Sequence, residues 1–146
     1  MYFDDLHEGD RFETAARTLS RDDIVAFARQ WDPQAFHLDE EAACASPYGG
    51  LIASGFHTML TAFVLTLEAD VWKEASMGSP GMDDIRWLRP VHPGDTLRAE
   101  AVVLKSVPSA SRPDRGRTTI RYDVKNQADE VVMTYTAIHI LRRRPG

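Results

Sequence analysis

The stretch from residue 55 to about residue 72 most constrains the fold, because it has a helical pattern with almost no polar face. Its large apolar side chains point in nearly every direction around a helix with 3.6 residues per turn. They are Phe56, Met59, Leu60, Phe63, Val64, Leu65, Leu67 and Val71. Such a helix in a soluble protein is buried on most sides. Only a crowded helix bundle or a sheet wrapped around the helix provides that burial.

From residue 82 onward, apolar residues alternate with a period of two, which is typical of strands that bury one face. The pattern predicts strands at residues 82–88, 96–106, 117–125 and 130–142. A proline-rich turn over residues 89–95 and a hairpin over residues 126–129 favour antiparallel pairing. Helices followed by such strands define the α+β class. We therefore expect one domain over residues 1–146, with a curved antiparallel sheet wrapped around a long central apolar helix.

Short elements are predicted before the apolar helix. Residues 11–18 favour a short strand, residues 38–44 one or two helical turns, and residues 46–50 a loop. A longer helix should start after Ser20, a typical N-cap residue, and end near residue 31, because Pro33 cannot continue it. Residues 32–37 should then be irregular. The side chains that this helix should turn toward the core are Ile24, Phe27, Ala28 and Trp31.

The composition of the chain argues against several classes of protein. A net charge of −5 disfavours a nucleic-acid partner, because binding phosphate requires a basic surface. The single cysteine, Cys44, excludes an internal disulfide, and the start of the chain lacks the pattern of a secretory signal. No apolar run reaches the roughly 20 residues that a membrane span needs. We expect a soluble, cytoplasmic protein with no membrane partner.

The residues best suited to catalysis are Asp32 and His37, which flank the irregular segment after the first long helix. A carboxylate and an imidazole in one cleft can activate water and move a proton near neutral pH. The alternative is structural: Asp32 caps a turn and His37 begins the next helix. Single-sequence grounds favour this alternative until further residues are considered.

Ser54 and Gly55 stand at the predicted start of the apolar helix, where free backbone N–H groups and the positive end of the helix dipole gather. A glycine at this point lets a carbonyl oxygen approach the backbone, as in an oxyanion site for a thioester enolate. Alternatively, Gly55 only allows close packing under the sheet. Both interpretations can hold together.

Other chemistries have weaker support in the sequence. No Gly-x-Ser-x-Gly motif is present, which disfavours a serine hydrolase. The five histidines are scattered and form no His-x-x-x-His pair, so we expect no metal site. No glycine-rich phosphate fingerprint occurs, so we expect no resident cofactor.

Three stretches carry a resemblance to a known family. They are Asp-Pro-Gln-Ala-Phe-His-Leu-Asp from residue 32, Gly-Leu-Ile-Ala-Ser-Gly from residue 50, and Arg-Trp-Leu-Arg-Pro-Val-His-Pro-Gly-Asp-Thr-Leu from residue 86. Over residues 6–141 the chain resembles the MaoC-like dehydratases, which include the (R)-specific enoyl-CoA hydratases of the hydratase-2 type. The family signature is Asp-x-Asn-Pro-x-His, and the spacing from Asp32 to His37 matches it.

The resemblance implies a hot-dog fold, a homodimer or higher homo-oligomer, and a hydro-lyase of fatty acid metabolism. The implied reaction is reversible hydration of a trans-2-enoyl thioester, of coenzyme A or an acyl carrier, to the (R)-3-hydroxyacyl thioester. It makes Asp32 and His37 the catalytic dyad and the Gly55 amide the donor to the thioester carbonyl. The residues that it places around the substrate are Gln34, Phe36, Ser54 and Phe56.

Some positions depart from the family pattern. Gln34 and Ala35 stand where the signature has Asn and Pro, and Ser54 replaces a histidine that often precedes the oxyanion glycine. A small polar residue that some members carry in the central helix corresponds to Phe63. Two alternatives stay open on the same fold: an acyl-thioester hydrolase, and a non-catalytic subunit that binds acyl thioesters.

Overall fold

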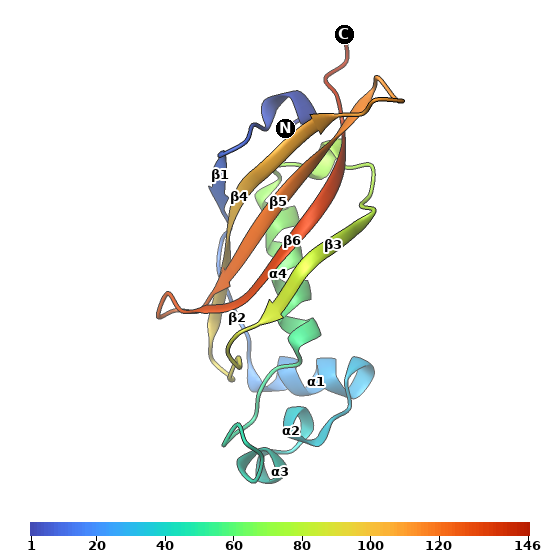
Figure 1. The fold of residues 1–146 in the computed structure, drawn as a ribbon. Helices are drawn as coiled ribbons and strands as arrows, with labels where there is room; N and C mark the ends of the chain where they lie inside the picture. Colours follow the sequence, from blue (N-terminus) through green and yellow to red (C-terminus); the bar gives the residue numbers. More distant parts are fainter.

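The computed structural model describes all residues 1–146 as an antiparallel sheet that curves around one long helix (Figure 1). The elements in chain order are η1 (Phe3–Asp5), β1 (Arg11–Glu13), β2 (Arg17–Thr18), α1 (Arg21–Trp31), α2 (Ala35–Leu38), α3 (Glu40–Cys44), α4 (Gly55–Ala69), η2 (Lys73–Ala75), β3 (Gly81–Trp87), β4 (Thr96–Pro108), β5 (Arg115–Lys125) and β6 (Val131–Arg142). The α+β arrangement expected from the sequence is confirmed.

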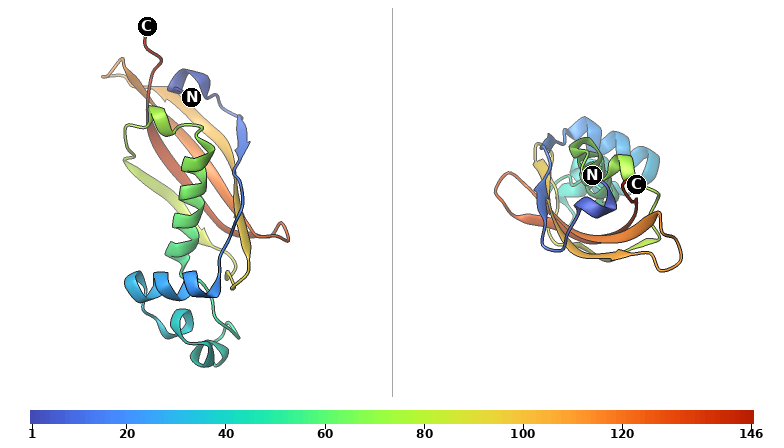
Figure 2. Two further views of the ribbon diagram at one scale, coloured as in Figure 1. Left: turned by 180° about the vertical axis from the view of Figure 1, so that it is seen from behind. Right: turned by 90° about the horizontal axis from the view of Figure 1, so that it is seen from above.

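The sheet has the strand order β1-β4-β5-β6-β3, and β2 also pairs with β4. All of these pairs are antiparallel. The view along the helix shows the sheet curving around α4, and the view from behind shows α1, α2 and α3 gathered at one end of it (Figure 2). Strand β3 forms one edge of the sheet and has no neighbour on its outer side.

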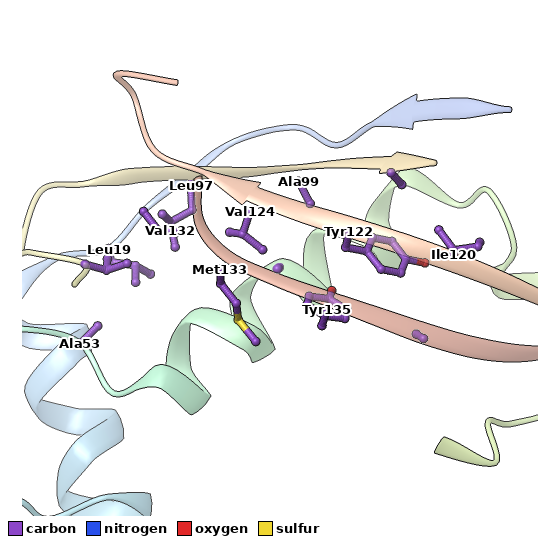
Figure 3. Packing of buried hydrophobic residues seen from close by; sticks show 14 of the residues in the cluster. Leu19, Ala53, Leu97, Ala99, Ile120, Tyr122, Val124, Val132, Met133 and Tyr135 are labelled. Atoms are coloured by element: carbon purple, nitrogen blue, oxygen red, sulfur yellow. The ribbon is translucent and has the colours of Figure 1, made fainter. Parts of the chain in front are cut away.

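The inner face of the sheet follows the predicted alternation. Leu97, Ala99, Ala101 and Val103 of β4 are buried, as are Thr118, Ile120, Tyr122 and Val124 of β5. Together with residues of β6 they form the main part of the core (Figure 3). A strand with one buried face alternates in this way because successive side chains point to opposite sides.

The orientation of α4 differs from the expectation of burial on most sides. Its face toward the sheet consists of small and threonine side chains with one leucine: Thr58, Thr61, Ala62, Leu65 and Thr66. Three larger apolar side chains instead form an exposed stripe, with Phe56 54%, Leu60 47% and Phe63 42% exposed. Small residues let the helix lie close to the sheet. The exposed stripe has the character of an unpartnered apolar surface.

The segments before α4 follow the sequence prediction with three corrections. Helix α1 starts after Ser20, whose hydroxyl accepts the Asp23 amide at 3.1 Å, and it ends before Pro33 as predicted. Trp31 is 66% exposed and does not face the core. The strand predicted over residues 11–18 is divided into β1 and β2, and the segment predicted to be irregular over residues 32–37 already enters α2 at Ala35.

The end of the long helix also differs from the prediction, since α4 ends at Ala69 and not near residue 72. Asp70 follows with a positive φ of 53°, and the buried Trp72 then packs as part of the core. No helix of the chain combines the length and the apolar character needed to cross a bilayer. Near the two termini, Arg143 forms an ion pair with Asp4, so the end of the chain is held against its beginning.

Candidate active site

Asp32 and His37 are brought together at the end of the molecule where α1, α2 and the start of α4 meet. Their side chains approach within 3.2 Å, measured between Asp32 Oδ2 and His37 Nε2. Asp32 caps the C-terminus of α1, and His37 lies in the last turn of α2. Both side chains are largely buried, with 15% and 5% exposed. The proline between them ends α1 and lets the chain turn back, so the two groups meet.

The imidazole of His37 is oriented by the segment that precedes α4. Its Nδ1 lies 2.7 Å from the Ile52 carbonyl oxygen. Because a carbonyl oxygen only accepts hydrogen bonds, Nδ1 carries a proton, and Nε2 is the ring nitrogen that faces Asp32. The Ile52 amide also donates to the Phe36 carbonyl at 3.2 Å, which ties the two loops together. The sequence did not indicate this role of Ile52, because it depends on a contact between separate segments.

The carboxylate of Asp32 is held in its charged form. Burial by itself raises the pKa of Asp32, but hydrogen bonding by Gln34 and by the nearby Ser54 hydroxyl, together with the adjacent His37, lowers it below its ordinary value. Gln34 Nε2 donates to Asp32 Oδ1 at 2.6 Å. The charged carboxylate therefore keeps one oxygen bound to Gln34, while the other faces His37.

Gly55 and Ser54 lie where the sequence predicts them, at the first turn of α4. The Ser54 hydroxyl accepts the Phe56 amide at 3.3 Å and so caps the helix. The amide of Gly55, the first residue of the helix, has no hydrogen-bond partner within the chain. The site thus has a free N–H group at the positive end of the helix dipole, as an oxyanion site requires.

Trp87, at the end of β3, is a site residue that the sequence interpretation missed. Its Nε1–H donates to the Gly55 carbonyl oxygen at 2.9 Å, and its ring lies against the Gly55 backbone. A Cβ atom at position 55 would be 2.5 Å from Trp87 Nε1, which is too close for any side chain. Gly55 is therefore required for packing against Trp87, as the structural alternative proposed. Its free amide remains available as well.

A cavity of about 440 Å³ contains these groups. Of the four residues expected around the substrate, Gln34, Phe36 and Phe56 line this cavity, whereas Ser54 is fully buried as the helix cap. Phe36 packs edge-on against the His37 ring at 4.5 Å. Phe56 meets the edge of Trp87 at 5.8 Å.

Two further lining residues were not expected from the sequence. Thr58 is 2% exposed, yet its hydroxyl forms no hydrogen bond within the chain, and it contributes a polar group to the cavity. Tyr48, from the loop of residues 46–50, lies 5.4 Å from the Phe36 ring. A threonine three residues after a helix-start glycine lies near it on the same helix face, and this spacing could have identified Thr58.

Comparisons with known proteins identify the family of the chain. Residues 5–131 match the protein family described as MaoC like domain. The chain is 33% identical to the uncharacterized protein YdeM of Bacillus subtilis over 129 residues, which cover 88% of this chain and 90% of that protein.

Two solved structures are similar over nearly the whole chain. The crystal structure of a MaoC-like dehydratase from Rhodospirillum rubrum has 41% sequence identity and a TM-score of 0.94, and the match covers 100% of this chain and 99% of that chain. The R-hydratase PhaJ1 from Pseudomonas aeruginosa has 25% identity and a TM-score of 0.77, covering 99% and 86% of the two chains. The sheet wrapped around α4 is thus a hot-dog fold, and the protein belongs to the MaoC-like dehydratase family.

Proposed function

We propose that the protein is a hydro-lyase that reversibly hydrates a trans-2-enoyl thioester, of coenzyme A or an acyl carrier, to the (R)-3-hydroxyacyl thioester. Membership of a family that contains hydratases and dehydratases supports this class of reaction. The observation that carries the proposal is the pairing of Asp32 with His37 at 3.2 Å beside the free Gly55 amide.

The orientation of His37 explains how one water molecule would be held. When the ring is neutral and its proton is on Nδ1, which donates to the Ile52 carbonyl, Nε2 is an acceptor, and the Asp32 carboxylate beside it is also an acceptor. Two acceptors at this distance need a hydrogen between them or a donor that serves both. A water molecule has two hydrogens and meets this requirement, so the dyad is suited to bind and activate one water.

In the hydration direction, the water oxygen forms a bond to C3 of the enoyl group and gives one proton to the dyad. The electron pair of the double bond moves toward the thioester, whose carbonyl oxygen becomes an enolate oxygen. The Gly55 N–H and the dipole of α4 stabilise that negative charge. C2 then receives a proton from the dyad, so that one water is added in total. Dehydration follows the same steps in reverse.

The test of this function is a reaction with crotonyl-CoA and the purified full-length protein. We expect the absorbance of the enoyl thioester to fall without release of free thiol, and chiral analysis to identify the (R)-3-hydroxyacyl product. Thiol release would instead identify an acyl-thioester hydrolase. Tight binding of the thioester with no turnover would identify a non-catalytic subunit.

We further propose that the protein is a homo-oligomer. Two features of one face support this: β3 has an unpaired edge, and α4 carries the exposed stripe of Phe56, Leu60 and Phe63. An unpaired strand edge next to an apolar patch is suited to pairing with a second copy. A second copy placed against β3 would cover the stripe and extend the sheet.

A further inference from the structure

Residues 51–53, just before the cap of α4, form a short buried segment between the active site and the loop of residues 90–95. They belong to no helix or strand, and each is only 4–5% exposed. Their backbone hydrogen bonds alternate between two sides, as in an extended chain. The groups of Ile52 face α2, whereas the Leu51 carbonyl and the Ala53 amide face the loop. The segment therefore connects that loop to the dyad.

The peptide group between Ile52 and Ala53 contains the carbonyl that orients His37. This carbonyl accepts a hydrogen bond from His37 Nδ1 at 2.7 Å, and the N–H of the same peptide donates to the Val91 carbonyl at 2.8 Å. The peptide is trans, so its carbonyl and its N–H point in opposite directions within one plane. Because the N–H is held by Val91, the direction in which the carbonyl meets His37 is restricted.

The preceding peptide group, between Leu51 and Ile52, is also held at both ends. Its N–H donates to the Phe36 carbonyl at 3.2 Å, and its carbonyl oxygen lies 3.3 Å from His92 Nδ1. A carbonyl oxygen only accepts hydrogen bonds, so Nδ1 of His92 carries a proton and donates it here. The distance is long for such a hydrogen bond, and we therefore expect its removal to have a moderate effect.

The loop that carries His92 is attached to two other parts of the fold. Asp95 Oδ2 accepts the His92 amide at 2.8 Å, and the Asp95 amide donates to the His92 carbonyl at 3.0 Å. The other oxygen of Asp95 accepts Gln127 Nε2 at 2.8 Å, from the connection between β5 and β6. Leu19, just before α1, accepts the Gly94 amide at 2.8 Å and donates to the Asp95 carbonyl at 3.0 Å. The backbone of His92 is thus fixed independently of the active site.

His92 does not line the active-site cavity, although residues 89–91 do. An effect of its side chain on the reaction must therefore pass through the buried segment. Apart from His37, it is the only side chain that bonds to the two peptide groups, because Phe36 and Val91 contribute backbone oxygens. It is the one attachment of the segment that a substitution can remove while leaving the dyad intact.

We propose that His92 is a positioning residue for His37. By holding the Leu51 carbonyl, it keeps the Ile52 carbonyl in the direction that binds Nδ1–H of His37 and leaves Nε2 facing Asp32. A ring that turns or changes its tautomer presents Nε2 to Asp32 for less of the time, and misplaced catalytic groups lower the rate. The effect on the rate rests on the proposed hydration activity, whereas the effect on the His37 ring requires no reaction.

Two substitutions separate the hydrogen bond from the volume of the side chain. His92→Asn keeps an N–H donor at the same number of bonds from the backbone as Nδ1, whereas His92→Leu has a similar branch point and no donor. His7→Leu is the matched control, because the side chain of His7 is 74% exposed and lies outside the cavity. Thermal melting of the full-length proteins shows whether each variant folds.

The first measurement is the state of the His37 ring, by nitrogen NMR of the imidazole at mildly alkaline pH. The spectrum of His37→Gln assigns the signals by their absence. We expect the unchanged protein, His92→Asn and His7→Leu to show a proton on Nδ1 of His37. In His92→Leu the two nitrogen shifts should move toward the average of the two tautomers. If they stay unchanged in His92→Leu, the inference is overturned.

The second measurement is the rate of crotonyl-CoA hydration. His92→Leu should lower kcat roughly three- to tenfold and leave KM unchanged, and His92→Asn should recover most of the loss. In the His37→Gln background, His92→Leu should lower the rate no further, because the residue that it positions is already gone. A purely structural role would lower the melting temperature and leave kcat and the His37 shifts as they are.

The outcomes distinguish this inference from the proposed function. Equal losses of kcat in His92→Asn and His92→Leu overturn the inference, as does a further loss in the His37→Gln background. If the unchanged protein does not hydrate crotonyl-CoA, the proposed function is overturned. The NMR comparison then still decides whether His92 positions the His37 ring.

Discussion

Trp87 Nε1–H donates to the Gly55 carbonyl oxygen at 2.9 Å, and its ring occupies the space that a side chain at position 55 would need. This contact gives Gly55 a packing role that is separate from the role proposed for its amide, which has no hydrogen-bond partner within the chain. A substitution at position 55 therefore disturbs Trp87 before it tests the amide. The two roles are separable only when Trp87 is changed as well.

In the Trp87→Ala background, Gly55→Ala and Gly55→Pro form a matched pair that differs in the amide hydrogen. Proline is well tolerated at the first position of a helix, and Ser54 has the extended backbone, ψ 139°, that a following proline favours. We expect the proline variant to turn over crotonyl-CoA about 10²–10³-fold more slowly than the alanine variant, because a donor to the enolate oxygen is lost. Steady-state kinetics and thermal melting check this. Equal rates would leave Gly55 with a packing role alone.

Gly55→Ala in the otherwise unchanged protein should lower the melting temperature, because the new Cβ displaces the Trp87 ring. In the Trp87→Ala background the same substitution should cost far less, since the clashing atoms are gone. The measurement is a double-mutant cycle of unfolding free energies. Additive costs would show that something other than Trp87 restricts position 55.

Asp32→Asn and His37→Gln should each lower kcat for hydration by roughly 10²–10⁴-fold, because each removes a group that binds water or moves a proton. The matched controls are Asp22→Asn and His7→Gln, which change exposed residues outside the cavity and should have no effect on the rate. Circular dichroism confirms that the variants fold. If both site variants have the same rate as the unchanged protein, the assignment of Asp32 and His37 as a catalytic dyad is contradicted.

Thr58→Val should lower kcat/KM about three- to tenfold with little effect on stability, because the Thr58 hydroxyl lines the cavity and has no partner within the chain. Thr61→Val is the control one turn further along α4, where the hydroxyl donates to the His57 carbonyl at 2.8 Å. That control should affect stability and not the rate. The reverse pattern would exclude Thr58 from substrate binding.

The neutral state of His139 predicts a dependence of stability on pH. In the unfolded chain the histidine binds a proton below its ordinary pKa of 6.5, whereas in the folded protein burial lowers the pKa to about 4. Between these values protonation favours the unfolded chain, so the free energy of unfolding falls as the pH is lowered. The loss attributable to His139 is roughly 3 kcal/mol across that range. Urea unfolding at several pH values should show that the free energy of unfolding falls less at low pH for His139→Gln than for the unchanged protein. If the two proteins lose the same free energy as the pH is lowered, this assignment is contradicted.

Leu60→Glu should convert the proposed homo-oligomer to monomers, because it places a charge in the middle of the exposed stripe on α4. Leu104→Glu is the matched control: Leu104 is similarly exposed, at 43%, but belongs to β4 and not to the stripe. Sedimentation velocity gives the molecular mass of each variant. If the protein without any substitution sediments as a monomer, the proposed assembly is contradicted.

Local rules of the chain predicted much of the fold. Ser20 and Pro33 mark the two ends of α1 because capping and the missing proline amide act within a few residues. Alternation of apolar residues predicted the inner faces of β4 and β5, since each strand buries one side. The spacing of Asp32 and His37 by itself favoured a structural interpretation, and the resemblance to the family signature made them the candidate pair, whose side chains lie 3.2 Å apart.

The features that local rules could not predict depend on contacts between segments that are distant in the sequence. The apolar pattern of residues 55–72 predicted burial on most sides. The tertiary structure instead turns the threonines of α4 to the sheet and leaves Phe56, Leu60 and Phe63 exposed, because small side chains allow closer packing. The contact of Trp87 with Gly55 and that of His37 with Ile52 join residues 32 and 15 positions apart. The sequence alone thus determined the limits of α1, the alternation of the long strands and, through the family signature, the candidate pair. Only the tertiary structure decided which faces meet and which N–H groups stay free, since neither choice is made by interactions within one segment.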